Sequence, residues 1–138
     1  MSSWLFLFFK IIFMAHLLYK EEVYAIVGYC IEVWKVLGYG FSEIIYKDAM
    51  EQEFFDNILP YIREDELSVF YKGKRLKHKF NDDFTLFENI IVEVKSGEDG
   101  IIEKTIQQTL NYLKASGCRV GLIVNFGKTG LEYKRLIV

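Results

Sequence analysis

Apolar residues recur every three or four positions between residues 20 and 37, which is the spacing of a helix that buries one face. They are Val23, Ile26, Val27, Cys30, Ile31, Trp34 and Leu37. Gly38 and Gly40 interrupt this pattern, and Ser42 stands where it can cap a second helix running to about Asn57. The pattern therefore predicts two helices before Pro60.

After Pro60 the pattern alternates between apolar and polar positions, as in strands. A first strand is expected over residues 67–71, a hairpin turn at 72–74 (Lys-Gly-Lys), a second strand over about 75–86 and a third over 90–96. The remaining chain predicts one more helix followed by two strands. The helix carries Ile102, Ile106, Leu110 and Leu113 and ends at Gly117, and the strands span 119–126, buried and parallel, and 131–138. The order of elements predicts an α/β fold with helices covering a mixed sheet.

The third strand carries two charged residues, Glu93 and Lys95, which must lie on the same face because side chains alternate along a strand. The simplest interpretation is one solvated face on which the two charges pair. Charges on a strand between other strands are costly, however, unless they are paired or bind an ion. Asp83 lies ten residues before Glu93, across a predicted tight turn.

The length of that turn determines which residues face each other. A two-residue loop at 88–89 would pair residue 84 with 93 and place Asp83 on the opposite face, whereas a three-residue loop at 87–89 pairs Asp83 with Glu93. Three-residue loops favour a left-handed residue at their end, and Asn89 tolerates that conformation. We therefore expect Asp83, Glu93 and Lys95 on one face. The other face would be filled by Phe84, Leu86, Val92 and Val94.

Two carboxylates and a lysine on one face suit a divalent cation. Mg²⁺ takes one or two protein carboxylates and completes its coordination with water and substrate phosphate. The ion lowers the pKa of a bound water and neutralises charge on the phosphate, while Lys95 orients the attacking water or stabilises the transition state. This chemistry is metal-assisted phosphodiester hydrolysis.

Composition bounds this hypothesis only loosely. The 138 residues suffice for one domain, and Cys30 and Cys118 have no metal-ligand spacing, so a reduced, cytoplasmic protein is expected. The net charge of −2 argues against a protein that coats nucleic acid. One stretch is nevertheless basic and has two compatible explanations: phosphate contacts, or lysines that prevent edge-to-edge pairing of an exposed hairpin. It contains Lys72, Lys74, Arg75, Lys77 and Lys79.

The N-terminal residues 1–16 form a separate apolar extension ahead of a domain at 17–138. Residues 4–19 are marginal in length for a membrane anchor, and Lys10 would lie near the middle of the bilayer. The alternatives are a helix packed on the domain or a true start at Met14. A membrane partner is expected only if residues 4–19 act as an anchor.

Several motifs resemble known proteins. Asp83 followed by Glu93-x-Lys95 is similar to the signature of the PD-(D/E)XK nuclease superfamily, and Gly40-x-x-Glu43-x-x-Tyr46 resembles the name motif of the GxxExxY proteins. The resemblance continues through "YKGKRL", "IIVEVKS", "QTLNYLKASGCRVGLIVNFG" and "LEYKR", so that it covers about Leu17 to Val138. It implies a restriction-endonuclease-like αβββαβ core.

The resemblance also implies site residues. Glu93 and Lys95 match directly, and Asp83 matches by its spacing. Asp82 is a rival for the aspartate position and is expected on the core side with Phe84. Glu43 matches a further metal ligand or lysine-orienting acid, and Gln108 matches a glutamine that projects towards the site. The simpler alternatives are a helix-dipole complement for Glu43 and an ordinary polar helix position for Gln108.

The function expected from this resemblance is that of a nuclease dependent on Mg²⁺ or Mn²⁺, an endonuclease or exonuclease acting on DNA, which would form a homodimer to cut both strands. The alternative is a non-catalytic module of the same fold that binds nucleic acid or a protein partner.

Overall fold

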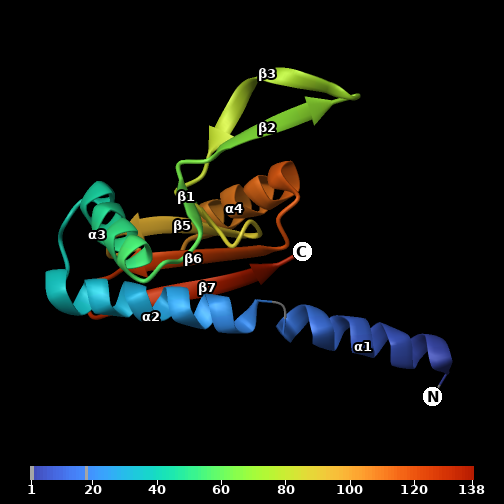
Figure 1. The fold of residues 1–138 in the computed structure, drawn as a ribbon, viewed down its shortest axis with the longest axis horizontal. Coiled ribbons are helices and arrows are strands. Elements are labelled where there is room, and N and C mark those ends of the chain that lie inside the picture. Colours follow the sequence, from blue (N-terminus) through green and yellow to red (C-terminus); the bar gives the residue numbers. More distant parts are fainter. Residues whose placement is uncertain (1, 18) are drawn as a thin grey trace.

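The computed structural model describes residues 2–17 and 19–138, with only the backbone described for residues 14–17. The side chain of Met14 therefore lies outside the described part, and the domain boundary after residue 16 stays a prediction. Four helices and seven strands follow one another along the chain (Figure 1). The helices are α1 (Ser3–Leu17), α2 (Lys20–Leu37), α3 (Glu43–Asp56) and α4 (Glu103–Ser116). The strands are β1 (Tyr61–Arg63), β2 (Glu66–Tyr71), β3 (Lys74–Asn81), β4 (Phe84–Leu86), β5 (Ile90–Ser96), β6 (Val120–Phe126) and β7 (Leu131–Ile137).

Five strands form the main sheet in the order β1-β4-β5-β6-β7. Only β5 and β6 are parallel, and α4 makes the crossover between them. Helices α2 and α3 cover one face of the sheet and α4 covers the other (Figure 1). This arrangement confirms the predicted α/β fold of the restriction-endonuclease type.

The helix and strand predictions outside the central region are confirmed. Helix α2 has the predicted bounds, and β6 is buried along its whole length because it lies between β5 and β7 with helices on both faces. Gly117 ends α4 in the left-handed conformation that favours glycine (φ 76°). Ser42 occupies the N-cap position of α3, although its side chain makes no capping hydrogen bond.

The prediction of a single second strand over residues 75–86 is wrong, because the structure has two strands there, β3 and β4. The chain bends at Asp82 and Asp83, so that β4 joins the main sheet while β3 pairs only with β2 in a separate two-stranded sheet. This β2–β3 hairpin, which we call the arm, extends away from the body of the molecule (Figure 1). A further strand, β1, was not predicted from the alternation. It pairs with β4 at the edge of the main sheet.

The register between β4 and β5 is the predicted one. Leu86 pairs with Ile90 and Phe84 with Val92, so the loop contains residues 87–89. Its conformation differs from the prediction, because the residues with positive φ are Phe87 (53°) and Glu88 (61°) rather than Asn89. Asn89 instead uses its side chain to accept a hydrogen bond from the amide of Arg119. The expected apolar set on one face is present in the larger core cluster, namely Phe84, Leu86, Val92 and Val94.

The apolar N-terminal segment forms helix α1, which points away from the sheet (Figure 1). None of the side chains of residues 3–13 joins either core cluster. Across residues 2–17 and 19–138, every helix is too short or too polar to cross a bilayer.

Candidate active site

Asp83 and Glu93 meet where the ladder between β4 and β5 opens. Because β4 begins at Phe84, the β5 backbone beyond Val92 has no strand partner on that side. Asp83 fills this gap: one of its carboxylate oxygens accepts a hydrogen bond from the amide of Val94 at 2.7 Å. In return, Glu93 Oε1 accepts one from the amide of Asp83 at 3.2 Å. The bend in the chain therefore brings the two carboxylates together.

Glu93 is buried, with 4% of its surface exposed, and is the unusual member of this pair. Burial, followed by the negative charge of Asp83, raises the pKa of Glu93 to about 8. The amide of Asp83 and the charge of Lys95 act in the opposite direction on this pKa. A buried carboxyl group with such a pKa is neutralised by a proton, or by a cation that takes the proton's place.

Lys95 lies two residues further along β5, on the same face as Glu93, and is partly buried. Its parallel neighbour on β6 is Asn125, whose amide donates to the carbonyl of Gly97 and to Glu132. In the described part of the chain, no ion pair occupies the Lys95 ammonium. The ammonium is close enough to lower the pKa of Glu93, and no ion pair with another acid holds it among the described residues.

The pattern analysis missed Lys47, a buried lysine on α3. Its ammonium lies 3.0 Å from Asp83 Oδ1 and 3.0 Å from Glu64 Oε1. Burial lowers the pKa of Lys47, but the hydrogen bonds to Asp83 and Glu64 outweigh it, so that this pKa is raised overall. The sequence held a signal, because position 47 lies one helical turn before the buried Met50 and two turns before the buried Phe54.

The segment Gly40-x-x-Glu43-x-x-Tyr46 places Glu43 near the carboxylates. The hydroxyl of Tyr46 donates to the Gly38 carbonyl at 2.6 Å and accepts from the Phe41 amide at 3.3 Å, which fixes the loop before α3. The ring of Tyr46 stacks on Phe126 at 4.1 Å. Glu43 is exposed at the start of α3. It lines one shallow pocket with Ser42, Ile44, Lys47, Asp83 and Ser96.

Helix α4 presents Tyr112 rather than Gln108 to the carboxylates. Gln108 is exposed, and no hydrogen bond links it to the site among the described residues. Tyr112 lies one turn later and is buried against Ile91 of β5. Burial and then the charges of Glu93, Asp83 and Asp82 raise the pKa of Tyr112. The helix faces the sheet with Thr105, Thr109, Tyr112 and Leu113. Of the predicted apolar stripe, Leu113 is buried and Leu110 packs against the core, whereas Ile102 is exposed.

Asp82, the rival aspartate, has a structural role. Its carboxylate accepts hydrogen bonds from the Thr85 hydroxyl and from the Asp65 amide. It is buried on the side of Thr85, so its predicted position beside Phe84 on the other face is wrong. Burial raises the pKa of Asp82 to about 6. These bonds hold the bend that positions Asp83.

The donor set fits a hard divalent cation. Among residues 2–17 and 19–138, no three His, Cys, Asp or Glu side chains gather as a complete ligand set. Mg²⁺ needs only one or two protein carboxylates, because water and phosphate supply its other ligands. Asp83 and Glu93 are two such carboxylates, and the raised pKa of Glu93 is what a cation beside it would lower.

Comparisons with known proteins agree with the fold of this chain. The chain is similar to the crystal structure of SSO0001 with a TM-score of 0.53 at 18% sequence identity. The similarity covers 67% of this chain and 48% of that one, so the matched part is about half of the solved structure. At this identity the likeness concerns the fold. Among curated proteins, none is significantly similar in sequence.

The family comparison is more specific than the structural one. A model of the PD-(D/E)XK nuclease superfamily matches residues 20–136, which include α2, the arm, both carboxylates and the final strand. Proteins of this superfamily generally use divalent metal ions. The match extends over most of the chain, and the chain therefore belongs to the PD-(D/E)XK nuclease superfamily.

Proposed function

We propose that this protein is a nuclease that hydrolyses phosphodiester bonds of DNA with the help of Mg²⁺ or Mn²⁺, and that it is one of the GxxExxY proteins. The observation that carries the proposal is the pair of hydrogen bonds that joins Asp83 to β5, from the Val94 amide to the Asp83 carboxylate and from the Asp83 amide to the Glu93 carboxylate. Lys95 lies two residues further along the same strand. Membership of a nuclease superfamily supports nucleic acid as the substrate.

Each residue has a distinct part in this proposal. Asp83 and Glu93 hold the ion, with Glu43 as a further ligand from the shared pocket. The bound ion supplies Lewis-acid chemistry to the phosphate. Lys95 orients the attacking water and stabilises negative charge in the transition state. A role of Gln108 in the site stays a prediction.

The arm supports binding of the nucleic acid backbone. All of β3 is exposed, and residues 67–81 include five basic residues and no acidic one, although the whole chain has a net charge of −2. Lys72, Lys74, Arg75, Lys77 and Lys79 are these basic residues. Lys79 pairs with Glu66, whereas Arg75 lies over the ring of Phe70 and Lys72 over that of Tyr71. Such cations next to exposed rings suit contacts to phosphates and bases. A homodimer stays a prediction.

A specific observation favours the non-catalytic alternative. Both carboxylate oxygens of Asp83 already have partners, Lys47 and the Val94 amide, without any metal ion. In a binding module of the same fold, this network would serve stability alone.

Cleavage assays separate the two candidates. The full chain is incubated with plasmid, linear and single-stranded DNA and with RNA, in Mg²⁺ or Mn²⁺, with EDTA as the control. We expect cleavage that EDTA abolishes and that Lys95→Ala reduces about a hundredfold or more, because one preorganised electrostatic group is lost. Lys134→Ala, on the exposed face of β7, is the matched control and should cleave normally.

Calorimetric titration with Mn²⁺ distinguishes the roles of the two β5 residues. Glu93→Gln should weaken metal binding, because it removes a ligand charge. Lys95→Ala should bind the ion as well as wild type or better, because it removes a nearby positive charge. A wild-type protein that binds no divalent ion and cleaves no substrate would establish the binding module instead.

A further inference from the structure

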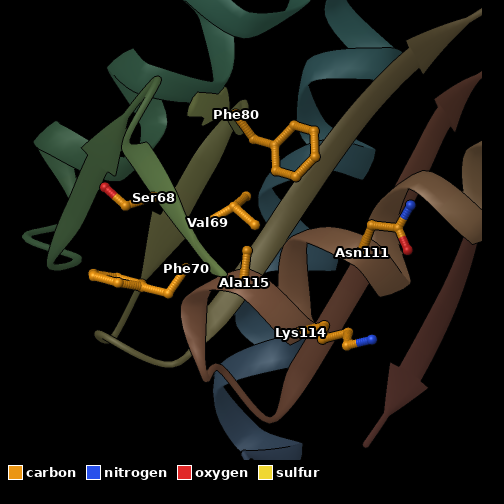
Figure 2. Close-up of a pocket in the computed structure, with 7 residues that line it drawn as sticks. All are labelled: Ser68, Val69, Phe70, Phe80, Asn111, Lys114 and Ala115. Carbon is orange, nitrogen blue, oxygen red and sulfur yellow. The ribbon is translucent and has the colours of Figure 1, made fainter. Parts of the chain in front are cut away.

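The arm and α4 enclose a pocket of about 410 Å³ that the proposed chemistry does not use (Figure 2). Val69 and Phe80 of the arm and Ala115 of α4 give it apolar walls. Ser68, Asn111 and Lys114 supply the polar groups around it. The volume is within the range of small-molecule sites, which begins at roughly 300 Å³. No acidic residue is among those that line it.

The pocket is connected to the carboxylates through packed side chains. The ring of Phe80 lies 5.2 Å from that of Tyr112, and Tyr112 packs with Ile91, two residues before Glu93 on β5. A chain of nucleotides whose phosphate reaches Asp83 and Glu93 could therefore place a neighbouring nucleotide beside Phe80.

We propose that this pocket receives one unpaired base of the DNA substrate, so that the nuclease acts on DNA with a single-stranded segment. The proposal rests on the proposed function for its substrate, and it adds strandedness to it. A base within a duplex is stacked on its neighbours, so it can lie against Phe80 only after it leaves the helix. The base stacks on the Phe80 ring, which is 38% exposed.

The polar groups of the pocket suit the rest of a nucleotide. Asn111 accepts a hydrogen bond from Gln107 with its carbonyl oxygen, which leaves its amide N–H groups to donate to the edge of a base. Lys114 is exposed on the same helix, and within the described residues it forms no ion pair. It can therefore contact a phosphate, the same role that we propose for the basic residues of the arm.

Fluorescence anisotropy with labelled oligothymidylate and with a labelled duplex, both in EDTA so that nothing is cleaved, tests the pocket. Phe80→Leu keeps an apolar side chain but removes the ring, so it should weaken single-strand binding roughly tenfold or more and leave duplex binding unchanged. Phe80→Tyr keeps the ring and should bind like wild type. Phe55→Leu, an exposed ring on α3, is the matched control and should have no effect.

A second variant covers the case in which Phe80→Leu disturbs the arm. Ala115→Trp fills the pocket from α4 and should also weaken single-strand binding, while thermal unfolding checks that each variant folds. Equal single-strand affinity in wild type, Phe80→Leu and Ala115→Trp would contradict the proposal that the pocket binds a base, even if the protein cleaves DNA. Ring-dependent single-strand binding in a protein that cleaves nothing would instead support the pocket and overturn the proposed nuclease activity.

Discussion

The ammonium of Lys47 lies 3.0 Å from Asp83 Oδ1, which places a buried cation on the carboxylate that we propose as a metal ligand. Lys47 also pairs with Glu64, so it connects α3 to the segment before the arm. In the metal-free protein this lysine supplies the positive charge that Asp83 requires. A metal ion at Asp83 would compete with it.

We therefore predict that Lys47→Met destabilises the metal-free protein but tightens divalent metal binding. Loss of the lysine leaves Asp83 without its cation, which should lower the free energy of unfolding by about 1–3 kcal/mol, since the partners are only partly buried. The free carboxylate should then bind Mn²⁺ more tightly in calorimetric titration. Arg63→Met is the matched control, because Arg63 also pairs with two acids, Asp48 and Glu51. Unchanged metal affinity in Lys47→Met would mean that Asp83 does not bind the ion.

The raised pKa of Glu93 predicts how stability changes with pH. Its folded pKa of about 8 exceeds the ordinary value of 4.5, so between these values the folded state holds more protons than the unfolded state. Stability of the metal-free protein should therefore fall as pH rises through this window, by an amount on the order of a few kcal/mol. Glu93→Gln should remove this fall. Urea unfolding in EDTA at a series of pH values measures it.

Asp82 provides an internal check on that measurement. Its pKa is raised only to about 6, so it contributes to the fall below pH 6 but hardly above. The change of the unfolding free energy between pH 6 and 8 therefore measures the titration of Glu93. A Glu93→Gln protein that keeps the wild-type slope in this range would contradict the assignment.

Tyr46→Phe tests whether the loop before α3 positions Glu43. The substitution leaves the Gly38 carbonyl and the Phe41 amide without the hydroxyl, at a cost of about 1–2 kcal/mol, while stacking on Phe126 remains. Because Glu43 follows this loop, we expect weaker Mn²⁺ binding as well as lower stability. Tyr133→Phe, an exposed tyrosine on β7, should change neither. Lower stability with unchanged metal affinity would limit Tyr46 to a packing role.

Removal of residues 1–13, which include most of α1, should leave the domain intact. A chain that starts at Met14 lacks nine large exposed apolar side chains, none of which joins a core cluster. They are Trp4, Leu5, Phe6, Leu7, Phe8, Phe9, Ile11, Ile12 and Phe13. We expect an unchanged Tm and less self-association, because exposed apolar patches promote aggregation. Calorimetry and light scattering measure the two effects, and a lower Tm in the shortened chain would show that α1 stabilises the domain.

The sequence by itself determined the elements whose signals are local. The three-and-four spacing of apolar residues defined α2, and the largely apolar segment 120–126 indicated a strand buried on both faces. The register of Asp83 with Glu93 was also predicted from a three-residue loop at 87–89, because side chains alternate strictly along strands, although the left-handed residues of that loop are Phe87 and Glu88 rather than Asn89.

Tertiary structure decided what depends on contacts distant in sequence. The bend at Asp82 is held by Thr85 and Asp65, and it separates the arm from the main sheet although residues 74–86 look like one strand. Lys47 and Tyr112 reach the carboxylates from helices on opposite faces of the sheet. Periodicity shows which face of a helix is buried, but the charges and rings that meet there are fixed only by how the helices pack.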